Sequence, residues 1–162
     1  MTGEFFIRTR TTIALAGNAT GIDANGWADA QSRYGMGLEE GALAKLMTPA
    51  PNKKPTGNSN VVTNGVAYLG STIGVKDERT LSIEVHVIAE TEANFLSLYS
   101  LICSEILDCG YIQVKTKYQT NTVYHLIYQD CQQYSQFSMK KAKMTLSFIE
   151  PHPEYRVPKS TM

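Results

Sequence analysis

The sequence has few cysteines and no excess of charge of either sign. Three cysteines stand among its 162 residues, and no two of them form a Cys-x-x-Cys motif. An odd number without metal-ligand spacing predicts that Cys103, Cys109 and Cys131 are free thiols rather than parts of a disulfide framework or a zinc site. Fifteen basic side chains balance fifteen acidic ones, so no overall field draws the chain to nucleic acid or to an acidic membrane.

Long apolar runs are missing as well. The N-terminal stretch MTGEFFIRTRTTIALAG lacks the apolar core, about 7–15 residues long, that a signal peptide requires. No other run approaches the length of a membrane-spanning helix. We therefore expect a chain that folds in the cytoplasm of the cell that makes it and that has no membrane partner.

Catalytic motifs are the third absence. The chain has no His-Glu-x-x-His motif, phosphate-binding loop or nucleophile elbow, and GMGLEEG at 35–41 misses the glycine spacing of a dinucleotide-binding loop. His86 and His125 alternate with apolar neighbours, which predicts solvent-facing positions on strands. His152 lies between two prolines and predicts a turn. The sequence therefore predicts no enzyme, no metal site and no cofactor.

Residues 78–156 have the strongest hydrophobic periodicity. A period of two at 79–88 predicts a strand, with apolar side chains on one face. The period then changes to about 3.6, which predicts a helix that begins after the N-cap Thr91 and stops at Gly110. This segment is expected to form the core of the fold.

Three further strands are predicted after the helix. The segments 111–118 and 123–134 predict a hairpin around the polar turn QTNT, and 141–150 predicts a last strand that two prolines end. The order β-α-β-β-β predicts an α+β fold, with one long helix packed on a mainly antiparallel sheet. The residues predicted to face inward from the first and last strands are Leu81, Ile83, Val85, Val87, Ala142, Met144, Leu146 and Phe148.

Residues 1–77 are poorer in core residues and richer in turn formers. TTIALA at 11–16 predicts a short strand, and EEGALAKLM at 39–47 predicts two turns of helix. The stretch 48–65 carries three prolines among Asn and Gly residues, and a structureless segment of that length is uncommon inside a compact domain. It is either a linker or an extended arm. We favour an arm of a single domain, with 157–162 as a short tail, because the N-terminal part has too few core residues to fold alone.

The order of features in residues 78–156 resembles that of a known family. The strand RTLSIEVHVIA leads to the long helix and GYIQV, the strand YHLIYQDC follows, and the chain closes on MTLSFIEPHPEYR. This series resembles the N-terminal domain of phage distal tail proteins and their relatives in siphophage-type tail tips. The segment GMGLEEGALAKLMTPAPNKK at 35–54 is similar to the region that precedes this core in the family.

The resemblance implies a split β-barrel or sandwich that assembles as a homo-oligomeric ring, commonly a hexamer, where the tail tube meets the tail tip or baseplate. It implies tail-tube and tail-tip proteins as partners, a place in the virion tail, and synthesis in the bacterial cytoplasm. The stretch 48–65 would be an arm between subunits, with Val61, Val62, Val66 and Tyr68 as its candidate contacts.

The resemblance also raises the question of sugar binding. Many members of the family carry a second, carbohydrate-binding-like domain, for which 162 residues leave no room, so we expect a purely structural role. A hypothesis of another class stays open, namely a monomeric β-module that binds a carbohydrate or another small ligand. Nine tyrosines support it, because aromatic faces stack on sugars. Self-association would separate the two hypotheses.

Overall fold

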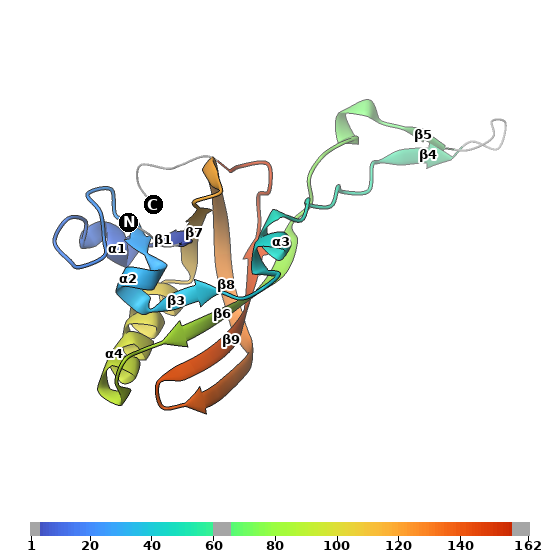
Figure 1. Ribbon diagram of the computed structural model, residues 1–162. Helices are drawn as coiled ribbons and strands as arrows, with labels where there is room; N and C mark the ends of the chain where they lie inside the picture. The colour runs from blue at the N-terminus through green and yellow to red at the C-terminus, as the bar shows by residue number, and fades with distance from the viewer. Residues whose placement is uncertain (1–3, 60–65, 157–162) are drawn as a thin grey trace.

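The computed structural model describes residues 4–59 and 66–156 and has an α+β fold (Figure 1). Seven antiparallel strands form one sheet in the order β2-β1-β7-β8-β9-β6-β3. Their bounds are Phe5–Arg8 (β1), Ala28–Asp29 (β2), Met36–Leu38 (β3), Arg79–Ile88 (β6), Tyr111–Thr116 (β7), Gln119–Ser138 (β8) and Lys141–Glu150 (β9). The predicted fold class is therefore confirmed.

The sheet curls into a split barrel that is not closed. Helix α2 (Ala30–Tyr34) leads directly from the edge strand β2 to the other edge strand β3. Gly35 ends this helix with a φ of 62°, and a Cβ there would lie 2.7 Å from the carbonyl oxygen of Ile88. Among the described residues the two edge strands do not pair with each other, so an open seam remains between β1 and β3.

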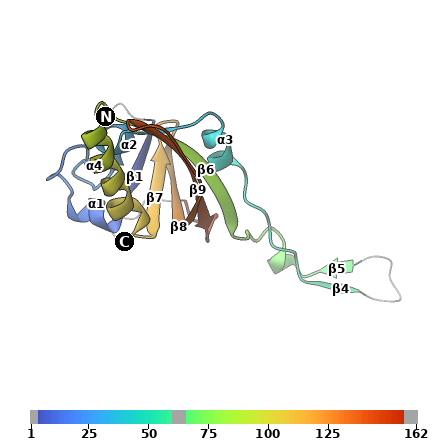
Figure 2. The ribbon, with the colours of Figure 1, turned by 90° about the horizontal axis from the view of Figure 1, so that it is seen from below.

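The long strand β8 holds the two halves of the sheet together. Its first part pairs with β7 and its second part with β9, and three register shifts bend it along the β9 side. Such bulges increase the local twist, which lets one strand serve both walls of a barrel. The curl of the sheet is visible from below in Figure 2.

One long helix packs on the sheet, as predicted. Helix α4 (Glu92–Ile102) continues into a π-helical turn at Cys103–Leu107. The Thr91 hydroxyl accepts a hydrogen bond from the Asn94 N–H at 3.1 Å, which confirms the predicted N-cap. Gly110 follows with a φ of 75°, the left-handed conformation typical of a helix end.

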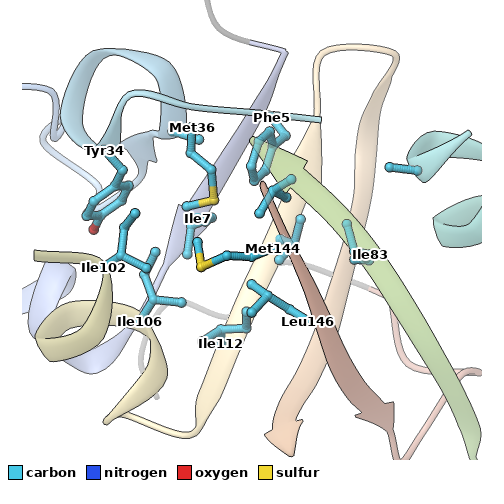
Figure 3. Close-up of a cluster of buried hydrophobic side chains, with 14 of the residues drawn as sticks. Phe5, Ile7, Tyr34, Met36, Ile83, Ile102, Ile106, Ile112, Met144 and Leu146 are labelled. Carbon is cyan, nitrogen blue, oxygen red and sulfur yellow. The ribbon is translucent and has the colours of Figure 1, made fainter. Parts of the chain in front are cut away.

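The hydrophobic core takes side chains from both parts of the chain. In Figure 3, Phe5, Ile7 and Met36 from the N-terminal strands lie beside Ile106 and Met144. All eight inward positions predicted on β6 and β9 are buried. Helix α3 (Ala42–Met47), which the sequence predicted, adds the buried Leu46. The N-terminal residues thus belong to the same core as residues 78–150.

Two predicted local elements are wrong. TTIALA forms helix α1 (Arg10–Ala14) and not a strand, because Thr9 and Thr12 make a reciprocal capping box and the strand β1 comes before it. The hairpin turn lies at 117–118 and not at QTNT, since Thr116 pairs with Gln119 and QTNT opens β8.

His125 is buried at 5% exposure, although the sequence predicted a solvent-facing position. It does point to the outer face of the sheet, but the C-terminal segment covers that face. The Tyr111 hydroxyl lies 2.9 Å from its Nδ1, and the Tyr155 ring centroid lies 6.2 Å from its ring. By contrast, His86 is half-exposed, and the three cysteines are free thiols as predicted.

Candidate assembly site

A two-stranded ribbon projects from the body between α3 and β6, and we call residues 48–77 the arm (Figures 1 and 2). Its strands are β4 (Gly57–Ser59) and β5 (Val66–Tyr68), which among the described residues pair with each other and with no other strand. The rungs below them are Leu69 N–H to Thr56 O (2.8 Å), Lys53 N–H to Val75 O (2.7 Å) and Asp77 N–H to Pro51 O (2.8 Å). In its described residues, the stretch 48–65 thus forms part of a β-ribbon rather than a structureless loop, and its role as an arm between subunits stays a prediction.

The arm leaves apolar side chains uncovered. Ile73 is 60% exposed and Val75 is 41% exposed, on the segment that follows the 3-10 turn Gly70–Thr72 and returns to the body. A two-stranded ribbon with no packed face is only marginally stable in water. Within the described residues, Ile73 and Val75 therefore have little apolar cover.

Two of the four predicted contact residues, Val61 and Val62, fall outside the described residues. Val66 and Tyr68 begin and end β5, where their backbones pair with Ser59 and Gly57. Their role in contacts between subunits stays a prediction. The sequence reading missed Ile73 and Val75, although their apolar character beside Gly74 was a usable signal.

A buried ionic network lies at the root of the arm, and the sequence analysis did not predict it. The Arg79 Nη1 donates to the carbonyl oxygen of Leu46 at 2.8 Å and also reaches that of Thr48, where the arm begins. Its Nε lies 3.0 Å from the fully buried carboxylate of Glu150. The Arg156 Nε and Nη2 donate to the same carboxylate at 3.0 Å and 2.9 Å.

The electrostatics of this network keep both arginines charged around one carboxylate. Burial lowers the pKa of Arg79 and the neighbouring Glu150 raises it, with a net decrease. Burial also lowers the pKa of Arg156, but its hydrogen bonds to Glu150 and the charge of that carboxylate together leave a net increase. The Tyr124 ring lies 5.7 Å from the Arg79 guanidinium and 4.8 Å from that of Arg156. Arg79 lies 71 positions before Glu150 and Arg156 six positions after it, so no periodicity of a strand or helix predicts the cluster.

A groove follows the open seam on the side of the body where α2 meets β3. One hollow of about 450 Å³ extends from Glu4 to His86, and a second of about 250 Å³ continues past Glu90 to α4. The residues that line both hollows are Gln31, Gly35 and Ile88. Because they share these walls, the two hollows form one continuous groove, which we call the seam groove.

One wall of the seam groove is an unpaired strand edge. The Ile88 N–H donates to the Gly35 carbonyl at 3.0 Å, which sets the alternation along β3. In an antiparallel pair this alternation directs the N–H and C=O groups of Met36 and Leu38 away from β6 and toward the seam. Within residues 4–59 and 66–156 no strand pairs with that edge.

A second buried carboxylate joins α2 to the π-helical turn. Glu105 accepts hydrogen bonds from the Arg33 Nε and from the Tyr34 hydroxyl, both at 2.8 Å. Burial raises the pKa of Glu105, but the bonds from Arg33 and Tyr34 outweigh it and hold this pKa below its ordinary value. Burial raises the pKa of Tyr34, and its bond to Glu105 raises it further. The cluster ties the helix between the two sheet edges to α4.

Two further kinds of site were sought in the part of the chain that the structure describes. No helix there has both the length and the apolar character that crossing a membrane requires. No three His, Cys, Asp or Glu side chains come together there as candidate metal ligands.

No protein-family model matches the chain, and no curated protein is similar enough to match. Among solved structures, the chain is similar to the Dit protein of phage SPP1, described as a paradigm of the hub adsorption apparatus in phages that infect Gram-positive bacteria. The identity is 14%, the TM-score is 0.44, and the match covers 62% of this chain and 39% of that chain. A likeness at this TM-score carries no functional argument.

Proposed function

We propose that this chain is a structural component of a phage or prophage tail, and that it forms a homo-oligomeric ring where the tail tube meets the tail tip or baseplate. The observation that carries the proposal is the arm, a projecting ribbon with uncovered apolar side chains. The resemblance of residues 78–156 to distal tail proteins supports the tail as its setting.

The arm has the physical properties of an assembly element. Burying Ile73 and Val75 against a neighbour would contribute about 1.5–3 kcal/mol for each side chain that becomes fully buried. The buried network of Arg79, Glu150 and Arg156 holds the root of the arm, so the arm leaves the body in a defined direction. Each chain supplies one arm, and a head-to-tail contact that repeats with a closing rotation forms a ring.

The oligomeric state of the full-length chain tests this proposal. Light scattering coupled to gel filtration is expected to show a defined oligomer, and electron microscopy of that peak a ring. Exchanging Ile73 and Val75 together for Ser is expected to shift the protein toward monomer. The matched control exchanges Leu96 and Met139 for Ser, two exposed apolar residues outside the arm, and should leave the oligomer unchanged. A wild-type chain that stays monomeric at high concentration, and binds no tail-tube or tail-tip protein, would contradict the proposal.

One observation favours the second candidate function, a monomeric carbohydrate-binding module. The Tyr99 and Tyr134 rings meet edge to face at 6.1 Å, and both side chains are exposed. Aromatic faces of this kind can stack on sugar rings. Glycan binding by a monomer, lost on exchanging Tyr134 for Ala, would support this function over the ring.

A further inference from the structure

We infer that the seam groove is the acceptor for the arm of the next subunit. This inference rests on the proposed ring and adds to it the surface on which the arm docks. The groove offers what an extended ribbon requires, namely a continuous trough, an unpaired strand edge and charges of the opposite sign.

The charges of the arm and of the groove are complementary. Lys53 and Lys54 are exposed on the segment of the arm that leads to β4, and no ion pair engages either of them within the described residues. The seam groove has the carboxylates of Glu4 at one end and Glu90 at the other. Opposite charges across an interface raise the association rate and fix the register of the partners.

Two cations of β9 beside the groove are already engaged. Lys143 lies opposite His86 and pairs with Glu84 at 3.5 Å. Lys141 lies opposite Ile88, and its ammonium lies 5.9 Å from the centre of the Phe137 ring. The backbones of Lys117 and Lys140 lie beside Glu4 and Glu90, since the Lys117 N–H donates to the Glu4 carbonyl and the Ala89 N–H to the Lys140 carbonyl. Within residues 4–59 and 66–156 no salt bridge engages the carboxylate of Glu4 or Glu90.

His86 and Glu39 form one rim of the groove. The His86 Nδ1 lies 3.3 Å from the Glu39 carboxylate, and both side chains are about one-third exposed (31% and 28%). This contact holds the imidazole over the β3 backbone, where a Cβ on Gly37 would lie 2.5 Å from its Nε2. The rim is therefore set by the body itself and stands ready before any partner arrives.

Backbone pairing explains why the occupant is a ribbon. The N–H and C=O groups of Met36 and Leu38 face the seam, and β4 and β5 pair only with each other among the described strands, so each has an outer edge. Adding a strand to an open sheet edge is a common mode of recognition, in which backbone hydrogen bonds give affinity and side chains give specificity. An arm strand of one copy beside β3 of the next would extend the sheet across the interface.

The positions of the two surfaces agree with a head-to-tail contact. The arm leaves the body beside α3, whereas the seam groove lies by α2 and the start of α4, on the other side of the barrel (Figure 1). A chain with its projecting element and its acceptor on different sides cannot easily satisfy both within itself. Repetition of one contact between copies then uses every arm and every groove.

Zero-length crosslinking tests the inference directly. A carbodiimide joins a lysine amine to a carboxylate only where the two are in contact, and mixing ¹⁴N- and ¹⁵N-labelled chains identifies links between copies. The expected products join Lys53 or Lys54 of one copy to Glu4 or Glu90 of another. Links from these lysines to other carboxylates in an intact oligomer would overturn the inference.

Charge reversal supplies the second test. Glu4→Lys with Glu90→Lys, or Lys53→Glu with Lys54→Glu, is expected to weaken association roughly tenfold to a hundredfold, because like charges then face each other. Combining both pairs in one chain should restore most of the affinity. The control, Asp108→Lys with Glu154→Lys, makes the same charge change at exposed carboxylates outside the groove and should have little effect.

The outcomes separate this inference from the proposed ring. If exchanging Ile73 and Val75 for Ser abolishes the oligomer but the groove reversals leave it intact, the ring stands and the acceptor lies elsewhere. If the wild-type chain is monomeric, the ring fails and the inference fails with it. Restoration by the combined reversal would establish the pairing of arm and groove.

Discussion

The body and the arm of this protein are stabilised in different ways. The body has a continuous core in which side chains from β1, β3, α4, β6 and β9 bury one another. The arm is a ribbon of backbone rungs whose apolar residues Ile73 and Val75 stay exposed. We therefore expect the body to fold without the arm, and the arm to gain stability against a second surface.

The junction between the two regions is the most ionic part of the described interior. Arg79 binds the carbonyl groups at the start of the arm and, with Arg156, the carboxylate of Glu150. A salt-bridge network fixes directions through its geometry, whereas apolar packing tolerates small rotations. The body is therefore stabilised mainly by apolar packing, whereas the ionic contacts at the junction set the direction in which the arm leaves it.

The largest expected effect comes from breaking the junction. The Glu150 side chain is fully buried (0% exposed). Exchanging it for Ala leaves the guanidinium groups of Arg79 and Arg156 without their carboxylate, and such a loss typically costs about 3–5 kcal/mol. Urea unfolding monitored by tryptophan fluorescence measures the loss. Exchanging the exposed Glu154 for Ala is the control and should change the free energy of unfolding by less than about 0.5 kcal/mol. An equally small change for Glu150 would show that the network does not hold the junction.

The second-largest expected effect is a pH dependence of the free energy of unfolding that arises in the body and not in the arm. The pKa of Glu105 is held below its ordinary value of 4.5 in the folded chain, so its bonds stabilise the fold above that value. This contribution is lost as the pH falls through the lowered, folded-state pKa. Exchanging Glu105 for Gln should cost about 1.5–3 kcal/mol at neutral pH, the worth of hydrogen bonds to a charged group.

The difference between wild type and this variant should shrink as the pH falls below 4.5. Unfolding in urea at several pH values measures it, and the oligomeric state at neutral pH serves as the control, since Glu105 lies in the body. A difference that stays constant down to acid pH would mean that the carboxylate is not charged in the fold.

Removing the arm is expected to have a small effect on the stability of the body. Replacing residues 52–76 by two glycines keeps the rung from Asp77 to Pro51 and should change the free energy of unfolding by less than about 1 kcal/mol. The same change should abolish the oligomer. Calorimetry and light scattering on one sample measure both quantities. A large loss of stability in the monomer would mean that the arm belongs to the core.

The smallest perturbation is a single cut. In the free chain, trypsin should cleave first after Lys53, which is exposed, because Pro55 protects the bond after Lys54. In the oligomer this site should be cleaved more slowly if the arm is docked. Mass spectrometry of the first fragments measures the order of cleavage. First cleavage inside residues 80–150 would contradict the division between arm and body.

Much of the body follows from the sequence. The alternation at 79–88 and 141–150 places the same side chains inside that the structure buries, since a strand with one face on a core needs this period. The cap at Thr91 and the glycine at Gly110 also bound the helix as expected. Local rules failed where two of them competed, as at Thr9, where a capping box prevailed over the β-branched residues that follow.

The sequence alone thus determined the α+β class and the main inward faces, because these depend on periodicity and turn chemistry that act over a few residues. Only the tertiary structure decided where Arg79, Glu105, Glu150 and Arg156 find their partners, why His125 is covered, and that the seam groove exists. Most of these contacts join residues tens of positions apart. Their energies depend on burial and on distances between side chains, which are fixed only when the sheet curls.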